Sequence, residues 1–276
     1  MTIGEAVHQG TRLLEDGGTA APRLTAEVLL AHALRRDRAY LYAHSDEELR
    51  EVGWIHFGRY LHERLKGKPT QYITKRQEFF GREFRVSPAV LIPRPETEHV
   101  VEAALKRISP GSAVVDVGTG SGAIAITLAL ESQAHVFATD ISAAALKVAE
   151  ENAGRLGAHV DFLCCDLLSA LRARSMDAVI SNPPYVPRGD EHSLQREVRE
   201  YEPHVALFAG ETGMELYARI LDDAARVLRP GGWVVLELGY TAAGPVSAML
   251  DAHWSAVELI PDLAGIPRVL AARLRG

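Results

Sequence analysis

The stretch Ala113-Val-Val-Asp-Val-Gly-Thr-Gly-Ser-Gly-Ala123 decides the fold class of this chain. Its first five residues form a short, mostly β-branched run, and an apolar segment with helical spacing begins after the last glycine. Alternate glycines let a backbone approach a ligand closely, and the N-terminus of the helix that follows offers free N–H groups. The stretch therefore predicts a strand, a glycine loop and a helix around a ligand site.

The same alternation of short apolar runs and helical segments continues along the chain. Helices are expected over 121–131, 142–157, 213–228 and 242–252. Further strands are expected at 135–139, 160–164, 176–181, 233–238, 255–260 and 268–274. This order is typical of a mostly parallel sheet with helices on both faces, so we expect an α/β fold with a seven-stranded sheet. Ligands of such sheets bind beyond the carboxyl ends of the strands.

The N-terminal part of the chain has helical patterns instead. A capping box, Thr2-x-x-Glu5, predicts the start of a first helix, and apolar spacing predicts a second helix over 24–36. Ser45-x-x-Glu48 has the same capping pattern and predicts the start of a longer helix. We therefore expect a small, all-helical N-terminal domain.

A short segment separates the helical part from the predicted sheet. Residues 77–86 predict two short strands that turn near Gly81, and three prolines between positions 88 and 95 mark a linker. We therefore expect a helical domain at 1–70, a β-hairpin with linker at 71–95 and the α/β domain at 96–276.

The composition excludes several classes of protein. Hydrophobic residues make up 47% of the 276 residues and charged residues 24%, which excludes disorder, collagen repeats and a disulfide scaffold. No apolar run approaches the ~20 residues that cross a bilayer, and the first residues lack the pattern of a signal peptide. The adjacent Cys164 and Cys165 are the only cysteines, so we expect a cytoplasmic protein with no metal site.

The charge is distributed unevenly. Residues 91–276 carry the acidic excess behind the net charge of −6, whereas residues 1–90 are slightly basic. An acidic α/β domain is a poor electrostatic match for a duplex phosphate backbone, so we expect no direct binding to nucleic acid. We also expect a monomer that does not bind a membrane. The basic stretch 64–85 is either a solvated face or a docking patch.

Acidic residues follow the second and third expected strands. Asp140 could accept hydrogen bonds from a ribose diol, or it could cap the helix over 142–157, a role that Ser142 could also fill. Asp166 could accept a hydrogen bond from an adenine amino group while Leu167 covers the ring, or it could be a turn residue. These residues predict a nucleotide-like site together with the glycine loop, which comprises Gly118, Thr119, Gly120, Ser121 and Gly122.

The sequence Asn182-Pro183-Pro184-Tyr185 follows the fourth expected strand and is the most specific signal in the chain. Two prolines fix the backbone and remove two N–H donors, so the carbonyl groups around them are rigidly aimed acceptors. Asn182 adds a side-chain carbonyl group, and Tyr185 adds an aromatic face. Beside a nucleotide site, such a corner can hold a flat group that carries a planar NH2.

These motifs resemble those of class I S-adenosylmethionine-dependent methyltransferases that act on nitrogen, and more narrowly the release factor glutamine methyltransferases. The most diagnostic segment is Leu91-Ile-Pro-Arg-Pro-Glu-Thr-Glu98. The resemblance covers nearly the whole chain, including its helical N-terminal part. The other matching segments are 69–73, 116–124, 181–185, 201–203, 206–207 with Gly210, and 262–268.

The resemblance implies a Rossmann-like methyltransferase fold and N5-methylation of the glutamine in the Gly-Gly-Gln loop of class 1 peptide chain release factors. The glycine loop, Asp140 and the pair 166–167 would bind S-adenosylmethionine, with Asn182 close to it. Residues 182–185 would bind the glutamine amide, with Asn182 and Pro183 as the catalytic residues. Leu167 stands where other members of the family carry Trp. The helical domain would then dock the protein substrate, since a pocket for one amide cannot recognise a whole protein.

Other functions remain open from the residues alone. One is methylation of a different planar amine, such as adenine N6 in nucleic acid or a glutamine of a ribosomal protein. The pattern Gly118-x-Gly120-x-x-Ala123 also fits a nicotinamide-dependent oxidoreductase, although that function leaves residues 182–185 without a role. A third is a non-catalytic adaptor. Glu237, on the fifth expected strand, is either a pocket residue or part of the sheet edge.

Overall fold

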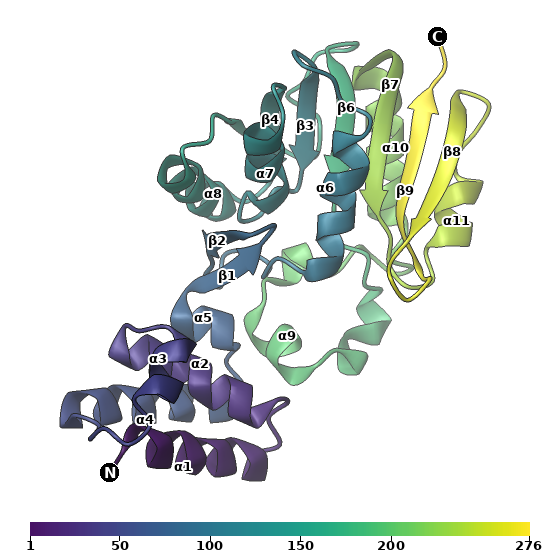
Figure 1. Ribbon diagram of the computed structural model, residues 1–276. Coiled ribbons are helices and arrows are strands. Elements are labelled where there is room, and N and C mark those ends of the chain that lie inside the picture. Colours follow the sequence, from purple (N-terminus) through teal and green to yellow (C-terminus); the bar gives the residue numbers. More distant parts are fainter. The chain divides into compact units, whose positions relative to one another are not determined.

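The computed structural model describes all 276 residues and divides into two compact units (Figure 1). The first unit comprises Met1–Arg76 and Gln195–Tyr201, and the second comprises Gln77–Leu194 and Glu202–Gly276. Each unit has a buried hydrophobic core of its own. No helix combines the length and the apolar character that crossing a bilayer requires.

The first unit is built from helices, as the sequence of its N-terminal part predicts, and it also includes a helix from the segment 195–201 that was not expected. They are α1 (Ile3–Asp16), α2 (Pro22–Leu34), α3 (Arg38–Ala43), α4 (Glu51–Leu65), α5 (Thr70–Thr74) and α9 (Arg196–Tyr201). Leu14, Leu29, Leu30 and Phe57 are fully buried at its centre. The ring of Phe57 lies so close to Gly10 of α1 that a Cβ there would be only 2.5 Å from it. α9 joins this unit through an ion pair of 2.6 Å between Arg64 and Glu197.

The two capping patterns of the first unit have different outcomes. The box at the start of α1 is confirmed: the Thr2 hydroxyl accepts from the Glu5 N–H, and the Glu5 carboxylate accepts from the Thr2 N–H. The predicted helix start at Ser45-x-x-Glu48 is wrong. The Ser45 carbonyl accepts an N–H of α1 at 2.8 Å and Glu48 forms a β-bridge with Thr2. Because the chain start pairs with this stretch, α4 begins only after it.

The second unit contains one large sheet, which confirms the predicted α/β fold. Its strands are β3 (Ala113–Val117), β4 (His135–Asp140), β5 (Asp161–Cys164), β6 (Met176–Ser181), β7 (Leu228–Glu237), β8 (Trp254–Pro261) and β9 (Pro267–Leu274). The seven strands lie in the order β5-β4-β3-β6-β7-β9-β8. All pairs from β5 to β7 are parallel, and β9 runs antiparallel to both of its neighbours. The connections reverse direction beside β3, where a sheet of this type binds ligands.

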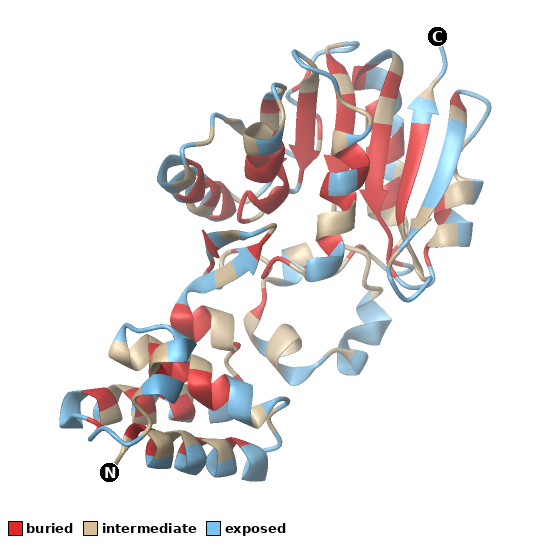
Figure 2. Ribbon diagram, in the orientation of Figure 1, coloured by how far each residue is buried: buried red, intermediate tan, exposed pale blue.

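Helices cover both faces of this sheet (Figures 1 and 2). They are α6 (Glu98–Leu105), α7 (Ala123–Glu131), α8 (Ala143–Leu156), α10 (Glu215–Val227) and α11 (Ala243–Ala248). Successive strand residues point to opposite faces. Val114 and Ile180 accordingly pack with α6 and α7, whereas Val115 and Val179 pack with α10 and α11. The apolar runs of the sequence are therefore buried on both sides.

A small hairpin precedes the sheet and packs against helices that cover it. Its strands, β1 (Arg76–Phe79) and β2 (Arg82–Arg85), confirm the predicted turn, and the buried rings of Phe79 and Phe84 meet edge to face. The Asn152 amide of α8 accepts the Arg85 N–H at 2.8 Å and donates to the Ser121 carbonyl at 2.9 Å. Asn152 thus ties the hairpin to the glycine loop. The remaining short helices are η1 (Pro95–Thr97), η2 (Arg188–Ser193) and η3 (His204–Ala206).

Candidate active site

The carboxyl ends of three neighbouring strands open into one cavity of the second unit. Val117, at the end of β3, pairs with Thr139 of β4 and with Ser181 of β6. The loops that follow these strands therefore begin at the same level of the sheet. The cavity has a volume of about 370 Å³. The predicted site residues that line it are Gly118, Gly120, Asp140, Asp166, Leu167, Asn182 and Pro184.

The five residues of the glycine loop divide into two groups. Gly118 and Gly120 have positive φ values of 71° and 55° and line the cavity, and a Cβ on either would meet no protein atom within 4 Å. Gly122 has a φ of 82°, and a Cβ there would lie 2.7 Å from Ile126. Thr119 and Ser121 are buried and are absent from the cavity lining. The first two glycines therefore shape the cavity, and the third is required for packing.

A buried carboxylate lies beneath the glycine loop. Asp116 is 1% exposed, and its Oδ2 accepts from the Thr119 hydroxyl at 2.6 Å and from the Ala125 N–H at 3.2 Å. Its Oδ1 has no hydrogen-bond partner. Burial raises the pKa of Asp116 to about 7 against these two hydrogen bonds, and the nearby Asp140 raises it further. Asp116 thus holds the glycine loop in place, although burying its charge is unfavourable in free energy.

Asp140 supports the same loop from β4. One carboxylate oxygen accepts the Gly120 N–H at 2.9 Å, and the other accepts the Ser142 N–H at 2.9 Å. The N-cap of α8 is Ser142, whose hydroxyl accepts the Ala145 N–H at 3.2 Å. Asp140 is therefore not needed as a cap. Each of its oxygens keeps a further lone pair that can accept from a ligand in the cavity.

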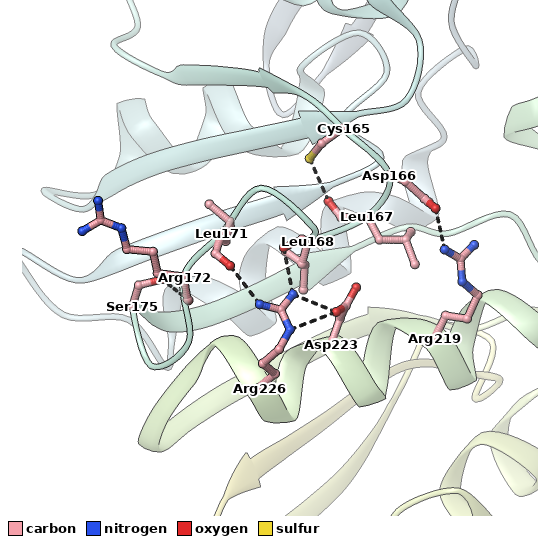
Figure 3. Close-up of polar contacts among 10 residues, drawn as sticks. All are labelled: Cys165, Asp166, Leu167, Leu168, Leu171, Arg172, Ser175, Arg219, Asp223 and Arg226. Carbon is pink, nitrogen blue, oxygen red and sulfur yellow. Dashed lines mark hydrogen bonds and ion pairs between the residues drawn. The ribbon is translucent and has the colours of Figure 1, made fainter.

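The loop after β5 carries Asp166 and Leu167 (Figure 3). Asp166 Oδ2 forms an ion pair of 2.6 Å with Arg219 of α10, and both side chains are about half exposed. Leu167 lines the cavity with a positive φ of 47°, a conformation that is unfavourable for a residue with a Cβ. Arg226 fixes the residues that follow, because its guanidinium donates to the Leu168 carbonyl at 3.0 Å. This anchor offsets the strained backbone at the cavity wall.

The Asn-Pro-Pro-Tyr corner begins at the end of β6. Asn182 Nδ2 donates to the Thr97 hydroxyl at 3.0 Å, and the Thr97 hydroxyl donates to Glu237 Oε2 at 2.6 Å. Asn182 and Pro184 line the cavity. Pro183 is buried and is absent from the lining. The Asn182 side chain is therefore held by its nitrogen, which leaves its carbonyl oxygen available as an acceptor.

Tyr185 completes the corner. Its ring packs against the backbone at Gly239, where an added Cβ would lie 2.9 Å from the ring. Burial raises the pKa of the Tyr185 phenol to about 12, and the charge of Glu237 raises it further. The ring is half-buried and is absent from the cavity lining. It therefore stays neutral and supports the corner from the side of the segment after β7.

Two further segments line the cavity, residues 89–91 and 203–210, and the motifs of the sequence assign no role to either. Glu202 connects them, because its buried carboxylate accepts the Ile92 N–H at 3.1 Å and pairs with Arg94 at 2.5 Å. The only sequence signal was that both segments take part in the family resemblance. The additional lining residues are Ala89, Val90, Leu91, Ile141, Ser142, Ala145, Pro203, Val205, Ala206, Phe208, Ala209, Gly210, Glu215, Leu216 and Arg219, with Thr139.

Comparisons with known proteins give the family of this chain. A family model described as the PrmC N-terminal domain matches residues 5–74, and one described as the methyltransferase small domain matches residues 97–199. The release factor glutamine methyltransferase of Koribacter versatilis (strain Ellin345) is 46% identical over 278 residues, which cover 99% of each chain. The chain belongs to the release factor glutamine methyltransferase family.

Two other matches agree with this assignment. The release factor glutamine methyltransferase of Moorella thermoacetica is 43% identical and covers 100% of this chain and 99% of its own. A crystal structure of a methyltransferase from Pyrococcus furiosus superposes with a TM-score of 0.55 at 20% identity, over 79% of this chain and 99% of that one. That structure confirms the Rossmann-like methyltransferase fold.

Release factor glutamine methyltransferases depend on S-adenosylmethionine, and the cavity fits this molecule. Gly118 and Gly120 leave open space at the wall, and Asp140 offers acceptor lone pairs. Leu167 and Ile141 contribute apolar surface for a flat ring. The volume of about 370 Å³ also falls within the usual range for a small-molecule site. No group of three or more His, Cys, Asp and Glu side chains is arranged to hold a metal ion.

Proposed function

We propose that this protein methylates the side-chain amide nitrogen, N5, of the glutamine in the Gly-Gly-Gln motif of class 1 peptide chain release factors. Relatives that match its full length at 46% and 43% identity are release factor glutamine methyltransferases. The single structural observation that supports the proposal is the bond from Asn182 Nδ2 to Thr97, because it leaves the Asn182 carbonyl free at the cavity. Two N–H groups of a carboxamide need acceptors of this kind.

The donor is S-adenosylmethionine, which supplies an electrophilic methyl group on a sulfonium. We assign its binding to the glycine loop 118–122, Asp140, the pair 166–167 and Asn182. The open space at Gly118 and Gly120 supports this assignment, as do the lone pairs of Asp140. In this assignment Leu167 contacts the adenine ring through its apolar side chain, and Asp166 accepts from the adenine amino group with the oxygen that Arg219 leaves free.

The substrate amide is the harder reactant, because its nitrogen lone pair is delocalised into the carbonyl group. In the proposed mechanism Asn182 Oδ1 and the Pro183 carbonyl each accept one N–H, while Pro184 contacts a flat face of the amide and Tyr185 supports the corner from behind. This holds the nitrogen in line with the methyl–sulfur bond, and positioning of this kind can supply about 7–11 kcal/mol. The nitrogen–carbon bond forms as the carbon–sulfur bond breaks. Positive charge then develops on nitrogen, where the two carbonyl dipoles stabilise it.

The proton is lost afterwards. An N-methylated, protonated amide is strongly acidic, so the proposed mechanism assigns no dedicated base. The proton leaves the nitrogen on the side of the two carbonyl acceptors and passes to water. Asn182 and Pro183 are therefore assigned as the catalytic residues, acting through position and dipole.

We further propose that the helical domain, residues 1–70, docks the release factor. A pocket for a single carboxamide cannot distinguish one protein from another, so specificity requires a second contact surface. The match of residues 5–74 to the PrmC N-terminal domain supports a separate role for this region. We expect a cytoplasmic monomer that acts on a protein and binds neither nucleic acid nor a membrane.

Mass spectrometry tests the proposed function directly. The protein and S-adenosylmethionine are incubated in three separate reactions, with a class 1 release factor, with ribosomal proteins and with DNA. We expect the release factor peptide that contains Gly-Gly-Gln to gain one methyl group on its glutamine. A methyl group found instead on a ribosomal-protein glutamine or on adenine N6 would identify the corresponding alternative and overturn this proposal.

A further inference from the structure

A buried hydrogen-bond chain runs from the cavity into the sheet. It links Asn182 at the end of β6, Thr97 in η1 and Glu237 at the end of β7. Thr97 and Glu237 are 4% and 3% exposed. These two residues lie 140 positions apart in the sequence, and neither is among the residues that line the cavity. The hydrogen-bond chain therefore reaches the cavity only through the Asn182 side chain.

The chemistry of these three side chains determines which group donates and which accepts in each hydrogen bond. A hydroxyl has one proton to donate, whereas an ionised carboxylate can only accept. Thr97 must therefore direct its proton to Glu237, and its oxygen is then left to accept from Asn182. An Asn side chain meets such an acceptor with its NH2 group, so its carbonyl oxygen faces the other way. The charge on Glu237 thus determines which end of the Asn182 amide faces the cavity.

We propose that Thr97 and Glu237 are positioning residues that hold the Asn182 amide with its carbonyl oxygen toward the substrate glutamine. The inference rests on the proposed function, since it concerns the acceptor for the glutamine N–H. When Glu237 is protonated, it can donate to Thr97, and Thr97 can then donate to the Asn182 carbonyl. In that state the Asn182 side-chain amide is flipped and presents its NH2 group to the NH2 group of the substrate. The substrate N–H then has no acceptor at this position.

The surroundings of Glu237 make its protonation state responsive to pH. Burial raises the pKa of Glu237 to about 7 against the Thr97 hydrogen bond, and Glu96 in η1 raises it further. Arg268 of β9 and Arg94 before η1 lower it, but these side chains pair with Asp262 and Glu202. The other ionisable groups that face it are the Tyr185 phenol and the Tyr217 phenol of α10, which donates to the Glu237 backbone carbonyl at 2.9 Å.

Substitutions at Thr97 test the positioning role. Thr97→Val keeps the shape but removes the hydroxyl, and we expect kcat for the release factor to fall by about 10- to 100-fold, as for the loss of one charge-assisted hydrogen bond. Thr97→Ser restores the hydroxyl and should recover most of that loss. Thr127→Val is the matched control, because Thr127 is fully buried in α7 and its hydroxyl bonds only within that helix. Affinity for S-adenosylhomocysteine, measured by calorimetry, should be similar in all three variants.

A pH profile with Glu237→Gln is the second test, and it does not depend on the folding of the Thr97 variants. In the parent, kcat should rise with pH through about 7 as Glu237 ionises. Glu237→Gln cannot ionise and should lose this rise. Asp116 has a pKa raised to about the same value. A rise that persists in Glu237→Gln but disappears in Asp116→Asn would therefore overturn the proposal.

A measurement without turnover separates this inference from the proposed function. The side-chain amide resonances of Asn182, followed by NMR in the complex with S-adenosylhomocysteine, should shift with a midpoint near the kinetic one. They should not titrate in Glu237→Gln. If the parent fails to methylate the release factor but the resonances titrate, the proposed function is wrong and the positioning role of Thr97 and Glu237 stands. If the Asn182 resonances do not titrate, or if Thr97→Val keeps the parental kcat, the positioning role is wrong.

Discussion

Two glycines of the same loop offer a matched pair of substitutions that separates ligand binding from packing. Gly120 and Gly122 have φ values of 55° and 82°, so an alanine at either position costs about 1–2 kcal/mol in backbone strain. Their surroundings differ. A Cβ at Gly122 would lie 2.7 Å from Ile126 and 3.2 Å from Ala149, whereas a Cβ at Gly120 would lie in open space at the cavity wall.

These geometries give different expected outcomes. Gly120→Ala should lower the free energy of unfolding by only about 1–2 kcal/mol, yet weaken S-adenosylhomocysteine binding by roughly tenfold or more, or about 1.4 kcal/mol. Gly122→Ala should lower the free energy of unfolding by about 2–5 kcal/mol, because overpacking adds to the strain. Urea unfolding and titration calorimetry measure the two effects. Parental ligand affinity in Gly120→Ala, or a larger destabilisation there than in Gly122→Ala, would refute the reasoning.

Three other substitutions probe the catalytic corner and the buried acids. Asn182→Ala should lower kcat by about 10²- to 10³-fold and weaken S-adenosylhomocysteine binding in calorimetry by a much smaller factor; a near-parental rate would show that its carbonyl is not the acceptor. Asp116 has its folded-state pKa raised to about 7, so its stabilising effect is complete below about pH 4 and is lost as pH rises through about 7. Compared with Asp116→Asn, the parent should lose up to roughly 4 kcal/mol of unfolding free energy over that range, and equal pH dependence of the two would contradict the shift. Glu202→Ala leaves Arg94 and the Ile92 N–H without their partner, which should cost about 3–5 kcal/mol in urea unfolding; a change below 1 kcal/mol would be inconsistent with a buried pair.

The elements of the sheet could be predicted because their signals are local. A β-branched run that is buried on both faces, followed by glycines and an apolar helix, identifies β3 and α7 without knowledge of the rest of the chain. The Thr2 capping box is equally local and was predicted correctly. Ser45-x-x-Glu48 shows the limit of this reasoning. Its backbone groups bond to the first residues of the chain, and such a partner cannot be inferred from a four-residue pattern.

In the candidate site, too, local features could be predicted from the sequence and long-range contacts could not. The residues directly after each strand could be selected because parallel strands bring their carboxyl ends to one edge, and Gly118, Asp140, Leu167 and Asn182 do line one cavity. The connections behind that edge could not be predicted. Thr97 and Glu237 meet across 140 positions. Thr97 lies in the diagnostic segment 91–98, but no local pattern shows that its partner is Glu237. The backbone of Leu167 is another example, because an apolar residue gives no sign of a positive φ.

The central claim is that the rigid corner after β6 binds the carboxamide of the substrate glutamine by its two N–H groups. A crystal structure of the protein with S-adenosylhomocysteine and a class 1 release factor measures this directly. We predict that the glutamine nitrogen lies within about 3.2 Å of both Asn182 Oδ1 and the Pro183 carbonyl oxygen. A glutamine bound elsewhere, or one that meets the corner through its carbonyl oxygen, would contradict the claim.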